Sequence, residues 1–332
     1  MSHNELNVNQ NPDLSVIIPV YNTEAYLEEA LNSILVQDYS NFEIIAINDG
    51  SQDCSGQILE MYKEKDPRVH VYHRENSGLS ATRNFGLSQA SGSYVYFFDS
   101  DDILLQGAFT HLMKLLKSVG GELIAFSGRY INDKGDAVST EKTLKKSEIT
   151  EPVPGEELLV KLMQSEIYSP VVSMYIYRKS FLHNNQLTFQ EGYIHEDEFY
   201  TIKALSIADR ALSVSDVFYE HRIRNGSIMK KEPGIMNVEG WSKAVSQILT
   251  FADKYPLHST THVMIMGRAR LLTHNSLGIL HKLQKEKNTT ISIDDYFSET
   301  QFEKLGYDVQ LRSTHPTLYR IYNKLKNLVF GK

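Results

Sequence analysis

The chain has 332 residues, enough for about two domains, and its 41% apolar and 23% charged residues are ordinary for a globular protein. Its formal net charge of −7 argues against general nucleic-acid binding, because domains with that function are usually basic. The single cysteine, Cys54, excludes an internal disulfide framework and a cysteine-based zinc cluster.

Residues 1–13 are polar and lack the apolar stretch of a signal peptide, so we expect a loose tail there. No run of about 18 apolar residues occurs in the chain, and no membrane span is expected. Together with the low cysteine content, these features fit a cytoplasmic protein.

Residues 14–98 alternate between strand and helix patterns. Short apolar runs predict strands buried in a sheet, at Leu14–Val20, Glu43–Ile47, Val69–Tyr72 and Tyr94–Phe98. Apolar residues at helical spacing predict three helices between them, the first capped by Asn22 or Thr23, the second by Asp53, and the third over 79–88. This βαβαβαβ order predicts an α/β fold with a mostly parallel sheet flanked by helices and right-handed crossovers.

After Asp102 the pattern is less regular. We expect a polar excursion or mobile loop over about 132–154. Around it we expect helices over 109–116 and 197–208, and short strands over 123–126 and 171–177. From Trp241 onward the chain looks helical, over 241–255 and 263–283.

The last segment, 309–332, contains five lysines or arginines and no acidic residue. Pro316 can open a helix that bears apolar and aromatic residues. Such a basic amphipathic helix can lie on an anionic membrane surface, or it can pack on its own domain with a solvated basic face. The sequence leaves both possibilities open.

Three carboxylates stand directly behind the predicted strand Tyr94–Phe98, in the sequence Asp99-Ser100-Asp101-Asp102. Crowded at the end of a buried strand, they would repel one another, and a bound divalent cation would remove that conflict. Hard oxygen ligands suit Mg²⁺ or Mn²⁺, ions that usually hold substrate phosphates as well. The alternative is an acidic turn in which Asp102 caps the next helix.

Five motifs follow one another along the chain: SVIIPVYNTEAYLEEALNSILVQ from Ser15, INDGSQD from Ile47, ENSGLSATRNFGL from Glu75, YVYFFDSDD from Tyr94 and HEDEFY from His195. Their order and spacing over about 14–230 resemble the inverting glycosyltransferases of family 2, which have the Rossmann-like GT-A fold. The resemblance implies transfer of a sugar from a nucleotide-diphospho-sugar, with UDP the expected nucleotide, to a hydroxyl group, with Mn²⁺ or Mg²⁺ as cofactor.

The same resemblance divides the chain into four parts. These are a flexible tail over 1–13, a donor-binding half over 14–110, an acceptor-binding half over 111–230 that completes the GT-A domain, and a helical C-terminal region over 231–332.

In the family, the loop after the first strand cradles the base and ribose of the donor. The matching residues here are Pro19, Val20, Tyr21, Asn22 and Glu24. Packing in the core is the alternative role for Tyr21.

Asp49 matches the acidic residue that accepts a hydrogen bond from the uracil N–H. Asn48 stands where many relatives carry another aspartate, which weakens any statement about the base. In the alternative reading, Asn48-Asp49-Gly50 forms only a turn.

Other residues match the part of the family's site that binds the diphosphate and the metal. By resemblance, Asp101 is the direct metal ligand, while Asp99 binds the metal or reaches the ribose, next to Ser100. Arg83, in a motif where Thr82 replaces a common alanine, could pair with the diphosphate or hold the acidic strand end. Three more residues follow a late strand: His221 as a possible metal or diphosphate contact, and Arg222 and Arg224 as diphosphate partners on a loop.

Asp197, which precedes a predicted helix, matches the catalytic base of the family. It would take the proton from the acceptor hydroxyl as that oxygen attacks the anomeric carbon, and one such displacement inverts the configuration. Glu196 would support Asp197, or be the base if the register differs by one. The alternative is that either residue only caps the helix.

Two other functions remain as alternatives. A sugar-phosphate nucleotidyltransferase would need a glycine-rich, basic phosphate loop after the first strand, which PVYNTEAYLEE lacks. A non-catalytic nucleotide-sugar or glycan-binding module would not need the candidate metal and base residues. The resemblance favours an enzyme that builds capsule, lipopolysaccharide or another surface glycan on a glycan or lipid-linked acceptor, in the cytoplasm or peripherally at the inner face of the membrane.

Overall fold

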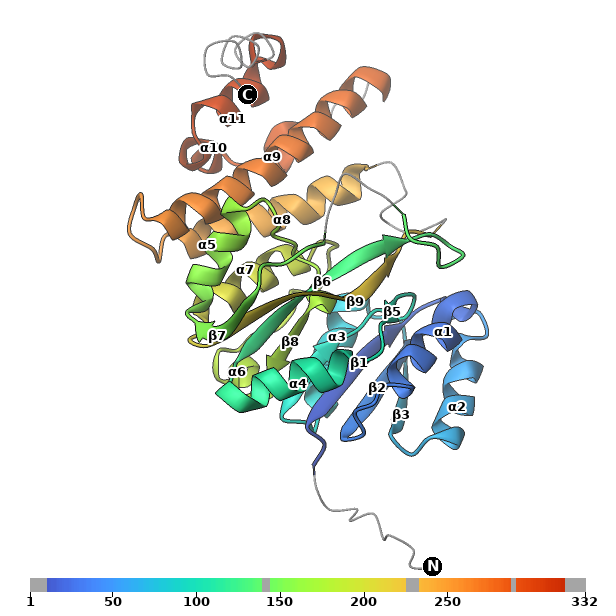
Figure 1. Cartoon of the computed structure of the whole chain (residues 1–332). Helices are drawn as coiled ribbons and strands as arrows, with labels where there is room; N and C mark the ends of the chain where they lie inside the picture. The colour runs from blue at the N-terminus through green and yellow to red at the C-terminus, as the bar shows by residue number, and fades with distance from the viewer. Residues whose placement is uncertain (1–10, 139–143, 225–232, 288–290, 320–332) are drawn as a thin grey trace, which may run out of the picture. The chain divides into compact units, whose positions relative to one another are not determined.

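The computed structural model describes residues 11–138, 144–224, 233–287 and 291–319. The chain divides into two compact units. The first comprises Met1–Glu191 and Ala204–Lys230, and the second comprises Gly192–Lys203 and Lys231–Lys332. The first unit is built around a β-sheet, and the described part of the second is built from helices (Figure 1).

The sheet of the first unit has the strand order β3-β2-β1-β4-β8-β6-β9-β5, with β7 beside β9. From β3 to β4 neighbouring strands are parallel, whereas β8 runs antiparallel to both β4 and β6. The strands are β1 (Leu14–Val20), β2 (Phe42–Asp49), β3 (Val69–Arg74), β4 (Tyr94–Phe97), β5 (Ile103–Leu104), β6 (Leu123–Ile131), β7 (Ile149–Val153), β8 (Tyr175–Arg178) and β9 (Ala211–Arg222).

Helices cover both faces of this sheet, which explains why every residue of β1 and β2 is buried. On one face Gly86 lies so close to Ile17 that a Cβ at residue 86 would come within 2.3 Å of its Cγ2. On the other face Phe109 packs against Phe42 and Tyr96, with ring centroids 5.5 and 6.1 Å apart. The helices of this part are α1 (Glu24–Leu35), α2 (Ser55–Lys65), α3 (Leu79–Gln89) and α4 (Ala108–Val119).

The expected alternation of strands and helices is confirmed over the first hundred residues, where β1 has the predicted bounds. The strand predicted over 171–177 is wrong in its first half, because Val172–Met174 forms a 3₁₀ turn before β8 begins. The remaining helices of the first unit are α5 (Gly155–Gln164) and α6 (Lys179–Asn184).

The prediction of a polar excursion or mobile loop over 132–154 is wrong at Ile149–Val153. Strand β7 lies in this segment and pairs with β9, and Leu144 and Lys146 are buried. Lys146 places its ammonium group 5.2 Å from the centroid of the Tyr175 ring. The face of an aromatic ring attracts such a cation, and composition does not reveal this contact.

Helix α7 (Asp197–Ile207) begins in the second unit and ends in the first. The helices predicted over 241–255 and 263–283 are confirmed as α8 (Ile235–Ala252) and α9 (Thr260–Lys287), which pack against each other. Two short helices follow, α10 (Glu299–Leu305) and α11 (Tyr307–Thr314).

Of the predicted basic tail 309–332, residues 320–332 lie outside the described residues, as do residues 1–10 of the N-terminal tail. Val309 of α11 is fully buried, and helical backbone resumes at 316–319. Among the described helices, none combines the length and apolar character needed to cross a membrane.

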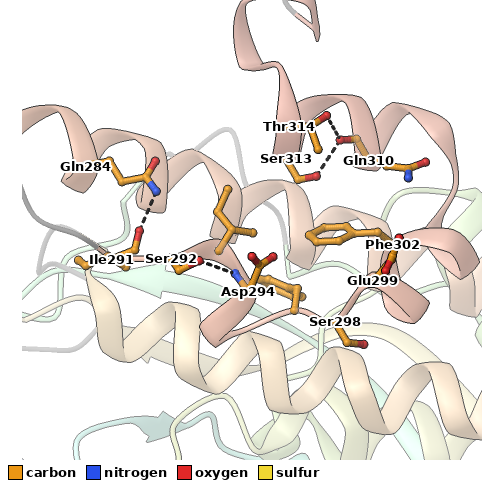
Figure 2. Close-up of a pocket in the computed structure, with 12 residues that line it drawn as sticks. Gln284, Ile291, Ser292, Asp294, Ser298, Glu299, Phe302, Gln310, Ser313 and Thr314 are labelled. Carbon is orange, nitrogen blue, oxygen red and sulfur yellow. Dashed lines mark hydrogen bonds between the residues drawn. The ribbon is translucent and has the colours of Figure 1, made fainter.

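The second unit contains a pocket of about 870 Å³ between the end of α9, the 3₁₀ turn Ile293–Asp295, α10 and α11 (Figure 2). Its described lining includes the carboxylates of Asp294 and Glu299 but no lysine or arginine. The described lining thus offers negative charge and no cationic side chain to a diphosphate.

Candidate active site

The predicted donor and metal residues of the first unit gather where three parallel strands end. Strand β1 pairs with β2 up to Val20 and Asn48, and with β4 up to Ile17 and Phe97. The turn Asp99–Asp102 follows β4, and Phe98 N still donates to Ile17 O at 2.9 Å. In open α/β sheets this carboxyl edge is the usual place for a ligand.

Asp99 is held by groups from two other elements. Arg83 of α3 donates to Asp99 Oδ1 at 2.8 Å, and the hydroxyl of Ser173 donates to Oδ2 at 3.0 Å. The Arg83 side chain is only 4% exposed. Arg83 therefore holds the acidic strand end, which is one of the two roles predicted for it.

Asp101 is paired with Arg224, whose Nε lies 2.5 Å from Asp101 Oδ2. Burial, and then the negative charge of Asp102, raise the pKa of Asp101 to about 6, although Arg224 acts in the opposite direction. The surroundings of Asp101 therefore disfavour the ionised form of its carboxyl group. A divalent cation would reverse that effect.

Asp102 is 1% exposed and joins the acidic turn to β9. Its Oδ1 accepts from Arg222 N at 2.7 Å, while its Oδ2 accepts from the Tyr219 hydroxyl and lies 3.1 Å from His221 Nδ1. The helix-cap alternative for Asp102 is wrong, because the short strand β5 follows it. Its carboxylate positions the turn.

His221 completes this network as a cation. Burial acts to lower its pKa, but the charge of Asp102, its hydrogen bond to Asp102, and the charges of Asp99 and Asp101 outweigh burial and raise the pKa to about 9. Each of the three carboxylates of the turn thus has its own cationic partner: Arg83 for Asp99, Arg224 for Asp101 and His221 for Asp102.

Arg222 differs from Arg224, although both were predicted as diphosphate partners. The Arg222 side chain is 1% exposed, and its Nε donates to Asp101 O at 2.9 Å. Its Nη1 donates to two backbone carbonyls after β6, and its Nη2 to Glu29 at 2.6 Å. The structure therefore gives Arg222 a positioning role, which its sequence neighbourhood did not indicate.

The predicted base-binding residues lie at the end of β1, in the loop after it and at the start of α1. Pro19 and Val20 lie within β1, whereas Tyr21 is 49% exposed and so is not a core residue. Asn22 has a positive φ of 51° and accepts from Gln52 N at 2.8 Å.

Two further residues predicted to bind the donor also join neighbouring elements. Glu24 accepts from Cys54 N at 2.7 Å. Ser100 is buried and accepts from the hydroxyl of Thr23 at 3.1 Å.

Asp49 is satisfied by neutral donors. Its Oδ1 accepts from the backbone N and the hydroxyl of Ser77 at 2.9 and 3.0 Å, and its Oδ2 accepts from Gly78 N at 2.9 Å. The residue therefore fixes the segment before α3. Each carboxylate oxygen has two lone pairs, so Oδ2 keeps the capacity to accept one further hydrogen bond.

The predicted base, Asp197, lies in the second unit with Glu196, at the start of α7. Asp197 is partly exposed, while Glu196 is buried. The next residue, Glu198, forms an ion pair with Arg268 of α9 at 2.6 Å.

The segment before α7 is held by α8. His195 has a φ of 67° and stacks on Trp241, with ring centroids 4.8 Å apart. Gly240 allows α8 to approach, because a Cβ there would lie 2.1 Å from Ile194 O.

Sequence reasoning missed several residues that hold these groups. Tyr219 could have been found, because it alternates with His221 on one strand and shares its face. Ser173 and Arg268 lie far from their partners along the chain, and no local pattern marks them.

The carboxylates of the turn fit a magnesium or manganese ion. In the described part of the chain, no group of three or more histidine, cysteine, aspartate or glutamate side chains is arranged as a metal site. Mg²⁺ is usually bound through one or two carboxylates together with substrate phosphates. Asp101 and Asp99 are the residues that would supply such a set.

Comparisons with known proteins agree with this architecture. The model of the family Glycosyl transferase family 2 matches residues 15–185. The glycosyltransferase GlyA of Streptococcus pneumoniae serotype 4 (strain ATCC BAA-334 / TIGR4) is 32% identical over 219 residues, which are 65% of this chain and 31% of GlyA. The chain thus spans about a third of that relative.

Two solved structures share the fold. TarS residues 1–349 of S. aureus, solved with UDP-GlcNAc, has a TM-score of 0.62 at 24% identity, over 91% of this chain and 81% of that one. The mannosyltransferase PcManGT of Pyrobaculum calidifontis, solved with GDP-Man and Mn²⁺, has a TM-score of 0.54 at 16% identity, over 98% and 89% of the two chains. The chain belongs to glycosyltransferase family 2 and has the GT-A fold.

Proposed function

We propose that this protein is an inverting glycosyltransferase that moves a hexosyl or N-acetylhexosaminyl group from a nucleotide-diphospho-sugar, with UDP as nucleotide, to a hydroxyl of a glycan or lipid-linked acceptor in polysaccharide biosynthesis. The proposal depends on one observation. Three carboxylates follow β4, at the sheet edge where β1 and β2 also end, and each has a cationic partner.

The donor would lie along this edge. Half-exposed Tyr21 offers an aromatic face to the base, and Asp49 offers a carboxylate oxygen to its imide N–H. Asp101, with Asp99, would hold Mn²⁺ or Mg²⁺, which as a Lewis acid stabilises the departing nucleoside diphosphate. TarS was solved with UDP-GlcNAc and PcManGT with GDP-Man and Mn²⁺, which supports a donor and a metal of these kinds.

Asp197 would act as general base. Its carboxyl group lies in the first turn of α7 and is partly exposed, so an acceptor hydroxyl could reach it. It would remove the acceptor hydroxyl proton while that oxygen attacks the anomeric carbon from the face opposite the diphosphate. A single displacement needs no nucleophilic side chain and inverts the configuration.

The test is a panel of nucleotide-sugars incubated with Mn²⁺ and candidate acceptors, with release of nucleoside diphosphate as the readout. We expect one UDP-sugar to be turned over, and Asp197→Asn to reduce transfer by about 10²- to 10⁴-fold with donor binding retained. Asp253→Asn is the control, because Asp253 is an exposed carboxylate of the second unit paired with Lys304. Full activity of Asp197→Asn would contradict the base assignment.

The same assay separates the alternatives. A binding module would bind a donor calorimetrically without releasing nucleoside diphosphate, and a nucleotidyltransferase would release pyrophosphate from a nucleoside triphosphate and a sugar phosphate. Either result would contradict the proposed function.

We also propose cytoplasmic placement with peripheral contact to an anionic membrane through 309–332. The buried Val309 supports packing for the first part of this tail, and the half-exposed Leu318 leaves apolar surface available. Unchanged binding to anionic vesicles after removal of 315–332 would contradict the membrane contact.

A further inference from the structure

The three cationic partners of the acidic turn differ in how firmly they are held. Arg83 is 4% exposed and His221 is 17% exposed. His221 also contacts the Tyr219 hydroxyl at 3.2 Å and lies beside the Tyr130 ring. Both cations are built into the first unit.

Arg224 is the most exposed of the three, at 23%, and it lies just beyond β9. Its described contacts are the hydrogen bond from Nε to Asp101 and the face of the Tyr26 ring, 5.5 Å from the guanidinium carbon. Two residues earlier, Arg222 donates to four oxygen atoms of the protein. Moving Arg224 from its position would therefore break fewer described contacts than moving Arg222.

Asp101 shares the acidic turn with two other carboxylates, Asp99 and Asp102, whose negative charges oppose its own. Arg224 is the cationic partner that compensates the charge of Asp101. The Asp101 oxygen bonded to Arg224, Oδ2, is one of the two oxygens of this carboxylate that a divalent cation could use. A metal ion on this carboxylate would stand close to the guanidinium group, and the repulsion between the two positive charges would weaken the Asp101–Arg224 bond.

We propose that Arg224 is an exchangeable counter-ion of Asp101, which holds this carboxylate in the empty protein and leaves it when the metal binds. The inference depends on the proposed function for its metal site. It goes beyond that function because the Arg224 side chain and the metal ion compete for Asp101. Metal binding would cost the Asp101–Arg224 bond, and a donor diphosphate would offer the released guanidinium a new partner. Metal and nucleotide should therefore bind together more tightly than either alone.

The test measures Mn²⁺ binding to the full chain by electron paramagnetic resonance, without nucleotide and then with UDP. We expect Arg224→Gln to tighten Mn²⁺ binding about tenfold without nucleotide, because a charge-assisted hydrogen bond no longer competes. The gain in Mn²⁺ affinity caused by UDP should shrink in this variant. Lys117→Gln is the control, because it removes an equal charge from the exposed ion pair with Asp13 and should bind Mn²⁺ as the wild type does.

Arg224→Gln binding Mn²⁺ equally or more weakly than the wild type would overturn the proposal. Asp101→Asn separates this failure from failure of the metal site. If Asp101→Asn binds Mn²⁺ like the wild type, the assigned metal site is wrong. If it loses Mn²⁺ while Arg224→Gln is unchanged, only the counter-ion role is wrong.

A second measurement needs no variant and covers the case in which Arg224→Gln does not fold. The arginine Nε–H signals of the wild type are followed by NMR as Mg²⁺ and UDP are added. We expect the Arg224 signal to move away from the position of a carboxylate-bonded group. An unmoved signal under saturating Mg²⁺ would overturn the proposal.

Discussion

The ends of β2 and β4 are both acidic and lie at the same sheet edge, but the protein treats their carboxylates differently. Asp49, after β2, accepts hydrogen bonds from neutral donors of Ser77 and Gly78. Asp99, Asp101 and Asp102, after β4, each have a cationic partner. An aspartate at a strand end can therefore order a neighbouring loop or form part of a charge cluster, and only its partners distinguish the two.

The difference suggests two roles in the proposed reaction. A carboxylate with neutral partners is suited to select a donor by hydrogen bonding, whereas a cluster of compensated charges is suited to exchange one cation for another. Substitution at the β4 end should therefore affect turnover, and substitution at the β2 end should affect donor affinity.

The largest effect is expected at the β4 end. Asp101→Asn should lower kcat by about 10³-fold, because the loss of a metal contact removes several kcal/mol of leaving-group stabilisation. Steady-state kinetics at saturating Mn²⁺ and donor measures this. A kcat within about threefold of the wild type would contradict the assignment of turnover to the β4 end and of donor affinity to the β2 end.

Substitution of Arg222 tests whether the acidic turn depends on the buried hydrogen bonds that this side chain makes. Arg222→Met should reduce the free energy of unfolding by about 3 kcal/mol, because several buried hydrogen bonds are lost. Urea denaturation measures this, with Arg129→Met as the control. Arg129 is 51% exposed and pairs with Glu220, so its loss should cost less than about 1 kcal/mol. Equal effects would contradict the positioning role of Arg222.

Lys146 provides a buried charge without a compensating carboxylate among its described contacts. Its Nζ has no hydrogen-bond partner in the described part of the chain, and burial lowers its pKa from 10.5 to about 7. Between these two values the unfolded chain binds more protons, so stability should rise with pH over that range. The penalty is fully present below about pH 7.

Lys146→Met should therefore be more stable than the wild type at low pH, and its advantage should shrink by about 2 kcal/mol between pH 6 and pH 9. Urea denaturation at several pH values tests this. An advantage that stays constant or grows with pH would show that Lys146 is not buried as a suppressed cation.

The smallest effect is expected at the β2 end. Asp49→Asn should cost about 1 kcal/mol of stability, because the amide NH₂ would face a backbone N–H donor. It should raise the KM for the donor with little change in kcat. A lowered kcat with an unchanged KM would assign Asp49 to the chemistry and not to binding.

The strands and helices of the first hundred residues could be predicted from the sequence, because the patterns that indicate them are local. Short, mostly apolar runs such as Leu14–Val20 favour buried strands, and the acidic turn behind β4 is evident from the sequence. It did not distinguish Arg222 from Arg224, because their roles depend on Glu29 and Asp101, which are distant along the chain. The burial of Lys146 in a polar segment was missed for the same reason.

The central claim is that the β4 end holds a divalent cation against the diphosphate of the donor. A crystal grown with UDP and Mn²⁺ tests it most directly, through the anomalous signal of manganese. We predict one strong peak bonded to Asp101 and to both phosphates, with Arg224 moved off Asp101. A manganese peak and a nucleotide bound elsewhere, with the Asp101–Arg224 pair intact, would contradict the account.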